Sequence, residues 1–180
     1  MAETRTTILR ATDPDDAPYL HRLYAPGQIR AALLDNRREP IYPTLDELQE
    51  ILIRRESIVS QYLYTVLTPR GEVLGFALLR GIQWETQVAE AALLLLEDAY
   101  YTYPEAVEAA NFLKRSACER LHLRQMLAVC LDTEAALRKF YLEQGFHSLG
   151  VQREVLYTKG SWHHLETFGF WFTSSSEGMH

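Results

Sequence analysis

The segment that most constrains the fold runs from Leu137 to Phe146, with the sequence LRKFYLEQGF. Its apolar residues recur at helical spacing, and Gly145 ends the predicted helix because glycine readily adopts the left-handed conformation of a helix C-terminus. A short apolar strand at residues 125–131 precedes this helix, and aromatic strands follow it. A helix in that position is typical of a β-α-β crossover, so we expect an α/β fold with parallel neighbours in its sheet.

The chain has 180 residues and reads as one domain, which we place at residues 1–172, followed by a flexible polar tail at residues 173–180. Hydrophobic residues make up 47% and charged residues 23%, as in ordinary globular proteins. The formal net charge of −6 argues against nucleic acid as a partner, because binding a phosphate backbone requires a basic surface.

We find no pattern of a targeting signal in this sequence. The N-terminal residues lack the apolar run of a signal peptide, and no apolar segment approaches the roughly 20 residues that cross a bilayer. We therefore expect a cytoplasmic protein with no membrane partner. Cys118 and Cys130 are expected to be inert, buried thiols, because a free cysteine is commonly a small core residue.

Hydrophobic periodicity predicts the element order β, α, α, β, β, β, α, β, α, β, β. The strands are expected at residues 6–11, 62–67, 72–80, 88–96, 125–131, 149–158 and 162–172. Antiparallel neighbours come first and a crossover follows, so we expect a single-domain, mixed but mostly antiparallel sheet with helices on both faces.

Capping residues predict where the helices begin. Short polar side chains accept hydrogen bonds from the free amides of a first helical turn, and a glutamate three residues later completes a capping box. The four predicted caps are Asp13, Thr44 with Glu47, Thr102 with Glu105, and either Asp132 or Thr133.

This order, with FYLEQGF in its place, resembles the GNAT superfamily of acyl-CoA-dependent N-acetyltransferases over Thr6–Phe172. The spacing from Tyr103-Pro104-Glu105-Ala106 to the final Gly-Phe looks most like the ribosomal-protein and aminoglycoside N-acetyltransferase branches. The resemblance implies direct transfer of an acetyl group from acetyl-CoA to a primary amine of a small molecule or a protein N-terminus. A homodimer is a possible assembly in such folds.

The resemblance also implies where acetyl-CoA would bind. In the family, the pantetheine arm lies between the fourth and fifth strands, and the diphosphate lies on amides of a glycine-rich loop at the next helix. Here that loop, Glu97–Tyr103, has no glycine and no basic residue and is acidic at its entrance. The cofactor-binding candidates are the amides of Leu94 or Leu95, the loop residues Tyr100, Tyr101, Thr102 and Tyr103, and the later helix residues Arg138 and Lys139. Arg138 and Lys139 also fit an ordinary solvated helix face.

Two residues are candidates for catalysis. Acetyl transfer from a thioester needs a deprotonated amine and an acid for the departing thiolate. Tyr141 matches the general-acid tyrosine of the family by its four-residue offset from Gly145, although a core tyrosine also fits. Glu90 is the acid inside the fourth strand and is the candidate base, although an exposed glutamate at a strand start fits equally well.

An alternative function remains open. The altered loop is also consistent with a GNAT-fold ligand-binding or dimerising module that does not use acetyl-CoA, and in that case the tyrosine loop should occupy the gap between the fourth and fifth strands. His163 and His164 are adjacent on a predicted strand, so they point to opposite faces, and we expect no metal site.

Overall fold

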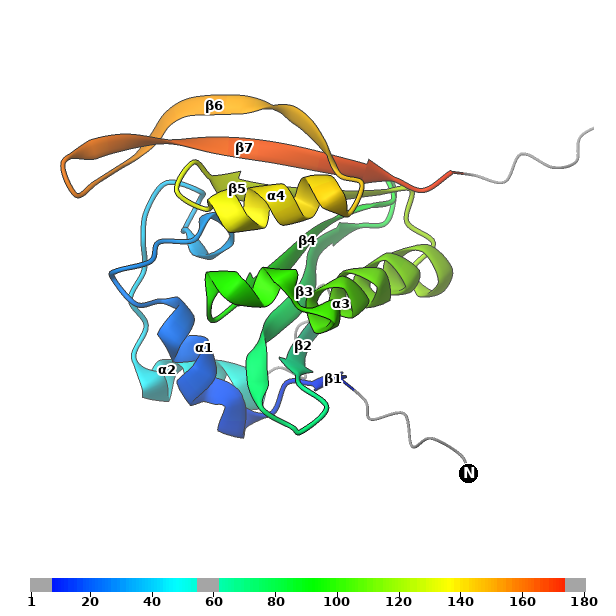
Figure 1. Ribbon diagram of the computed structural model, residues 1–180, viewed down its shortest axis with the longest axis horizontal. Helices are drawn as coiled ribbons and strands as arrows, with labels where there is room; N and C mark the ends of the chain where they lie inside the picture. The colour runs from blue at the N-terminus through cyan, green and yellow to red at the C-terminus, as the bar shows by residue number, and fades with distance from the viewer. Residues whose placement is uncertain (1–7, 55–61, 174–180) are drawn as a thin grey trace, which may run out of the picture.

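A seven-stranded sheet forms the centre of the molecule, with the strand order β1-β2-β3-β4-β5-β7-β6. The computed structural model describes residues 8–54 and 62–173 (Figure 1). Strand β4 pairs with β5 in parallel, and the other neighbours are antiparallel. The predicted mixed, mostly antiparallel α/β sheet is therefore confirmed. The strands are β1 Leu9–Ala11, β2 Tyr62–Leu67, β3 Val73–Gln83, β4 Val88–Leu95, β5 Gln125–Leu131, β6 His147–Thr158 and β7 Ser161–Trp171.

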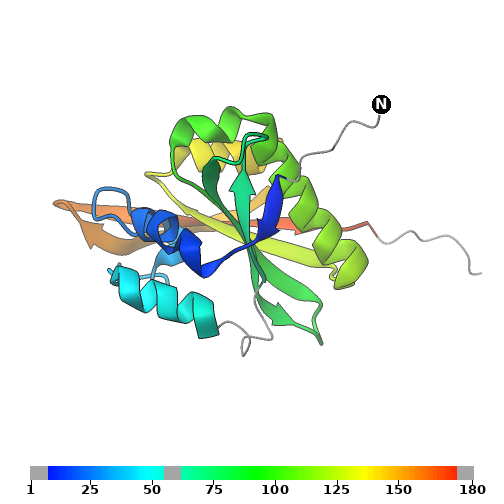
Figure 2. The ribbon, with the colours of Figure 1, turned by 90° about the horizontal axis from the view of Figure 1, so that it is seen from below.

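Helices cover both faces of this sheet, as Figure 2 shows. Helices α3 (Pro104–Arg115) and α4 (Ala135–Glu143) lie on one face, and α1 (Ala17–Leu23) and α2 (Leu45–Ile53) lie on the other. Short turns named η1 (Pro14–Asp16), η2 (Ala31–Leu33), η4 (Asp98–Thr102) and η5 (Ser116–Arg120) join or extend these helices. None of the helices in the described ranges is long and apolar enough to cross a bilayer.

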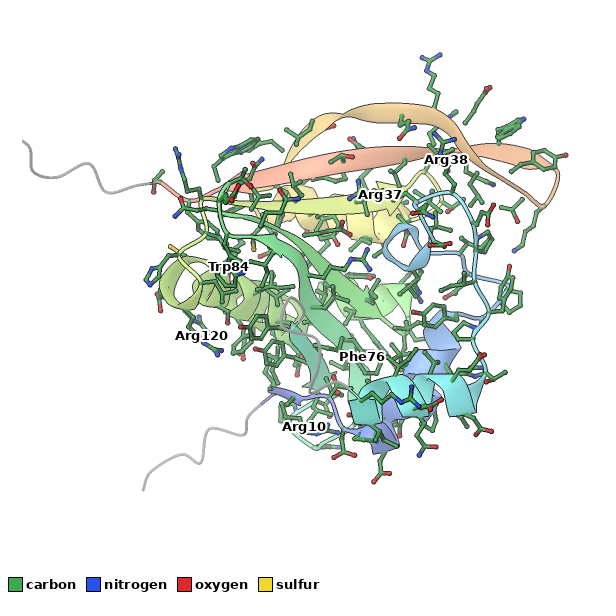
Figure 3. The ribbon with its side chains drawn as sticks, turned by 180° about the vertical axis from the view of Figure 1, so that it is seen from behind. Arg10, Arg37, Arg38, Phe76, Trp84 and Arg120 are labelled. Carbon is green, nitrogen blue, oxygen red and sulfur yellow. The ribbon has the colours of Figure 1, made fainter. Side chains whose placement is uncertain are left out.

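Strand β4 contributes to the core on both faces. Its odd-numbered side chains pack under α3 and α4, and its even-numbered side chains pack with α1 and α2, where Phe76 of β3 is also fully buried (Figure 3). This two-sided burial explains the nearly continuous apolar sequence of the strand. Cys130 is buried as predicted, but Cys118 is exposed, because it lies in η5 on the outer side of the turn that follows α3.

Two of the predicted helix caps are confirmed. The Asp13 side chain accepts from the Asp15 amide and forms a capping box with Asp16. The Thr44 side chain accepts from the Glu47 amide at 3.2 Å, and the Glu47 side chain accepts from the Thr44 amide at 2.7 Å.

The other two caps were predicted wrongly. Helix α3 begins after Tyr103, and Thr102 instead donates from its hydroxyl to the Ala99 carbonyl at 2.7 Å inside η4. Helix α4 begins after Glu134, so neither Asp132 nor Thr133 caps it. At Thr102 a local hydrogen bond within η4 therefore takes the place of a cap.

The hairpin of β6 and β7 extends past the sheet and reaches the segment between α1 and α2 (Figure 1). At its tip, the Lys159 ammonium donates to the Gly27 carbonyl at 3.1 Å. The hairpin and the segment between α1 and α2 therefore meet at one end of β5. The boundary of the predicted polar tail stays a prediction, because residues 174–180 lie outside the described ranges.

Candidate active site

A gap opens between β4 and β5 in the middle of the sheet. The two strands pair only through Val88–Glu90 and Gln125–Leu127, and beyond that point they diverge. On its other edge β4 continues to pair with β3 up to Leu95. The Leu96 amide donates to Leu74 of β3, so the even-numbered amides of β4 face β3 and the amides of Leu93 and Leu95 face the gap. Of the two candidate amides, only that of Leu95 is therefore presented to the gap.

The side chain of Tyr101 fills this gap on the β4 side. Its hydroxyl donates to the Leu93 carbonyl at 2.9 Å and accepts from the Leu95 amide at 3.3 Å. The ring is 6% exposed and contacts Phe140 at a centroid distance of 5.6 Å. Burial raises the pKa of Tyr101, so the phenol stays protonated and can bridge both backbone groups. One residue of the tyrosine loop therefore lies in the gap, the arrangement expected for the alternative of a module that does not use acetyl-CoA.

The side chain of Glu134 performs the corresponding role on the β5 side. One carboxyl oxygen accepts from the Leu131 amide at 2.8 Å and from the Ala31 amide at 3.0 Å. The other oxygen is buried and has no hydrogen-bond partner among the described residues. Burial raises the pKa of Glu134, and the two amides and the nearby Arg30 partly oppose that rise. Both diverging strands thus have side chains bonded to their free backbone groups.

The Tyr141 ring lies beside the same gap, on the α4 side. Its side chain is 3% exposed and contacts Phe146 and Phe168, and a small cavity of about 20 Å³ adjoins it. Its hydroxyl has no hydrogen-bond partner in the described part of the chain, although the backbone of Leu93 is close. Burial raises the pKa of Tyr141 well above 10. The phenol therefore keeps its proton over the whole physiological pH range.

A pocket of about 240 Å³ lies where the two diverging strands end. Residues 27–30 line one side, Asp98 and Glu134 line the side next to the gap, and the β6–β7 hairpin lines the third side. Arg30 is 7% exposed and bonded to Gln28, and its Nε has no partner within the described ranges. The pocket therefore presents charged groups of both signs beside the gap.

His163 also lines this pocket. Its Nδ1 lies 3.0 Å from a carboxyl oxygen of Asp132. A carboxylate at hydrogen-bond distance from one ring nitrogen orients the imidazole in the pocket. Among the described residues no group of three metal-ligating side chains comes together.

A family model described as the acetyltransferase (GNAT) domain matches residues 9–166. The chain belongs to the GNAT acetyltransferase family. GNAT domains catalyse N-acetylation of amines with acetyl-CoA as cosubstrate, and the acetyltransferase function expected from the sequence is confirmed at that level. No curated protein sequence matches this GNAT chain.

Solved structures with the same fold include a single-residue variant of the spermidine N-acetyltransferase SpeG from Vibrio cholerae, with a TM-score of 0.76 and 18% identity over 92% of this chain and 95% of that chain. The dodecameric form of that enzyme has a TM-score of 0.73 and 18% identity over 91% of this chain and 92% of that chain. At such identity the similarity concerns the GNAT fold alone. Homodimer formation by this chain stays a prediction.

The strand geometry of the gap suits acetyl-CoA, but a side chain of the protein occupies one strand edge. The strands diverge, and the Tyr141 hydroxyl has no partner among the described residues. The Tyr101 hydroxyl, however, already binds the Leu93 carbonyl and the Leu95 amide. In η4 the Tyr100 and Tyr103 amides are also bonded within the turn, and Glu97 and Asp98 add negative charge. Tyr101 therefore holds the β4 edge in this conformation, and binding of acetyl-CoA in the gap stays a prediction.

Glu90 lies away from Tyr141. Its two carboxyl oxygens accept from Arg80 at 2.6 Å and from Arg37 at 2.7 Å, and Arg37 comes from the segment between α1 and α2 (Figure 3). Its side chain is on the even-numbered face of β4, opposite the face that packs under Tyr141. The two ion pairs link that segment to the sheet, and the role of Glu90 as a base stays a prediction.

The remaining cofactor-binding candidates lie around the β4–β5 gap rather than in it. Tyr100 and Tyr103 contact each other at 5.2 Å, and Tyr103 is exposed. On α4, Arg138 pairs with Glu166 at 2.6 Å, and Lys139 lies 3.8 Å from Glu143. The two basic side chains therefore form ion pairs along an exposed helix face, and their role in binding acetyl-CoA stays a prediction.

Sequence reasoning missed Glu134, Arg30 and His163 as site residues. Glu134 stands seven residues before Tyr141, and its burial depends on the Ala31 amide far away in the sequence. The pairing of His163 with Asp132 requires the β6–β7 hairpin to lie beside the end of β5, which only the strand order reveals.

Proposed function

We propose that this chain transfers the acetyl group of acetyl-CoA to a primary amine, with the thioester in the β4–β5 gap and the amine in the adjoining pocket. One observation carries the proposal. The Tyr141 hydroxyl is buried without a hydrogen-bond partner in residues 8–54 and 62–173, and it lies beside strands that stop pairing after Glu90 and Leu127. A buried hydroxyl without a partner is costly to stability, so its retention suggests a ligand that uses it.

Tyr141 is proposed as the proton donor. Acetyl-CoA supplies a thioester, and a thiolate in need of a proton leaves when the amine takes the acetyl group. Burial disfavours a thiolate here, as the rise in the pKa of the neighbouring Cys130 thiol to about 12 illustrates. The Tyr141 phenol is protonated at neutral pH and can deliver its proton where the thiolate is least stable.

His163 is proposed as the base for the amine. It lines the pocket and is oriented by Asp132, whereas Glu90 does not line the pocket and is engaged by two arginines. Glu90 remains the competing candidate. A base must reach the proton that it removes, and position in the pocket therefore favours His163.

The pocket charges favour a particular class of amine. Asp98 can face an ammonium group, while Arg30 and Lys159 can face an anionic group. The named structural neighbours act on spermidine, a polyamine, and a polycation would meet Arg30 and Lys159 unfavourably. We therefore propose an acceptor that carries a carboxylate or phosphate beside its amine.

The test is CoA release by the full-length protein from acetyl-CoA with spermidine and with a panel of free L-amino acids. The proposal expects turnover with an amino acid to exceed turnover with spermidine. Turnover with spermidine alone would keep the transferase function and reject the acceptor class. No acetyl-CoA-dependent product with any amine, from a protein that binds acetyl-CoA, would reject the transferase function.

A second candidate function is a ligand-binding module that does not use acetyl-CoA. The observation that favours it is the occupied gap, with Tyr101 on one strand edge and Glu134 on the other. Under this reading the 240 Å³ pocket is the ligand site and Tyr141 is a core residue. Binding of a small ligand in the pocket, with no binding of acetyl-CoA by the wild-type or opened protein, would support it.

A further inference from the structure

Tyr101 makes the contacts that a neighbouring strand would make with β4. An adjoining strand would use the carbonyl of Leu93 and the amide of Leu95, and the Tyr101 hydroxyl uses both. The pantetheine arm of acetyl-CoA carries two secondary amides, so it can add to a free strand edge as an extended peptide does. The phenol and such an arm cannot hold the same two backbone groups at once.

The position of Tyr101 differs from that of its neighbours in the same loop. Tyr100 is half-buried, Tyr103 is exposed, and their rings contact each other. Tyr101 alone among these three turns into the gap, where its ring contacts Phe140 of α4. It belongs to η4, a turn of five residues that lies outside the strands and takes no part in their pairing. Departure of the Tyr101 hydroxyl from Leu93 and Leu95 would therefore leave every strand pair of the sheet in place.

We infer that Tyr101 is a displaceable occupant of the β4–β5 gap, and that acetyl-CoA enters only when this hydroxyl has left Leu93 and Leu95. The inference rests on the proposed function for the identity of the entering ligand. The apparent affinity for acetyl-CoA is then the affinity of the open conformer multiplied by the fraction of molecules that are open. Tyr101 thus sets the threshold concentration at which the site loads.

Tyr101→Phe isolates the hydroxyl, because it keeps the ring that contacts Phe140 and removes both hydrogen bonds. Loss of two hydrogen bonds from the closed conformer alone should raise acetyl-CoA affinity about tenfold. Tyr19→Phe is the matched control, since it removes an exposed phenol on α1, away from the gap. Calorimetric titration of full-length wild type and both variants with acetyl-CoA measures the effect.

The expected result is tighter binding by Tyr101→Phe and unchanged binding by Tyr19→Phe. In the free proteins, hydrogen exchange at the Leu95 amide should be faster in Tyr101→Phe, which shows directly that the contact is lost. Equal or weaker binding by Tyr101→Phe, with that faster exchange, would overturn the inference and leave the proposed function intact. No binding by any of the three proteins would reject both, because the gap would then stay closed to acetyl-CoA even without the hydroxyl.

The wild-type protein provides a second test that needs no variant. Tyr101 is buried in the closed conformer, so tetranitromethane should nitrate it slowly compared with Tyr103. Saturating acetyl-CoA should increase nitration of Tyr101, as the ring leaves the gap. Unchanged or slower nitration of Tyr101 in the bound protein would contradict the displacement.

Discussion

The amide of Ala31 donates a hydrogen bond of 3.0 Å to the carboxyl group of Glu134, across 103 residues of sequence. The same oxygen accepts from the Leu131 amide at 2.8 Å. One buried side chain therefore fastens the segment between α1 and α2 to the end of β5, and this link forms a wall of the pocket.

Removal of this carboxyl should destabilise the protein. Glu134→Ala leaves two buried amides unpaired, and we expect the free energy of unfolding to fall by about 2 kcal/mol. Glu134→Gln keeps an oxygen acceptor and is the matched control, with less than half of that loss. Urea denaturation measures both, and equal stability of Glu134→Ala and wild type would show that the link contributes nothing.

A comparison of wild type with Glu134→Gln also tests whether Glu134 is protonated. Burial raises the pKa of Glu134 above 4.5, so its contribution to stability is greatest below pH 4.5 and falls as pH rises through the folded value. Wild type should therefore lose stability relative to Glu134→Gln as the pH rises above 4.5 through the raised pKa of the folded state. A difference that grows in the opposite direction would mean that the carboxyl is held ionised.

The contribution of Asp16 to stability should depend on pH in the opposite direction. Burial acts to raise the pKa of Asp16, but hydrogen bonds from Arg10, the Asp13 amide and Thr65 outweigh it and lower the pKa below 3.8. Its contribution is thus present above pH 3.8 and is lost as pH falls through the folded value. Asp16→Asn should cost about 2 kcal/mol at neutral pH, and the loss should shrink in acid.

An exposed ion pair provides the control for Asp16. Arg22 and Glu97 lie 3.4 Å apart with half-exposed side chains. Glu97→Gln should change the free energy of unfolding by less than about 0.5 kcal/mol, because solvent screens such pairs. If thermal and urea unfolding give the same loss for Asp16→Asn and Glu97→Gln, the buried hydrogen bonds of Asp16 do not stabilise the fold.

The identity of the base can be read from the turnover of two variants. If His163 removes the amine proton, kcat should fall about 100-fold in His163→Gln, because glutamine cannot accept that proton. Glu90→Gln should keep most of the turnover and lower stability, because Arg80 and Arg37 lose their partner. Loss of turnover in Glu90→Gln alone would assign the base to Glu90.

The order of elements was predictable because it depends on local patterns. The cap at Asp13, the capping box at Thr44 and the apolar run of β4 act within a few residues, and all three are confirmed. The cap at Thr102 was wrong because the hydroxyl found a carbonyl within η4 that no pattern reveals. Local signals therefore give the fold of this chain but not the exact starts of α3 and α4.

Most of the site depends on contacts between distant residues. Arg37 reaches Glu90 across 53 residues, and His163 reaches Asp132 across 31. Gly75 illustrates a different limit, because a Cβ there would lie 2.2 Å from the Leu94 carbonyl oxygen of β4. The sequence contains that glycine, but only the pairing of β3 with β4 shows that no side chain fits.

The most direct test of the account is turnover and stability of Tyr141→Phe beside wild type, with acetyl-CoA and an accepted amine. Tyr141 is proposed to supply the proton that the thiolate takes, so kcat should fall about 100-fold while acetyl-CoA affinity stays the same. Because its hydroxyl is buried without a partner among the described residues, the variant should also be more stable by about 1 kcal/mol. Wild-type turnover by Tyr141→Phe would contradict the central claim.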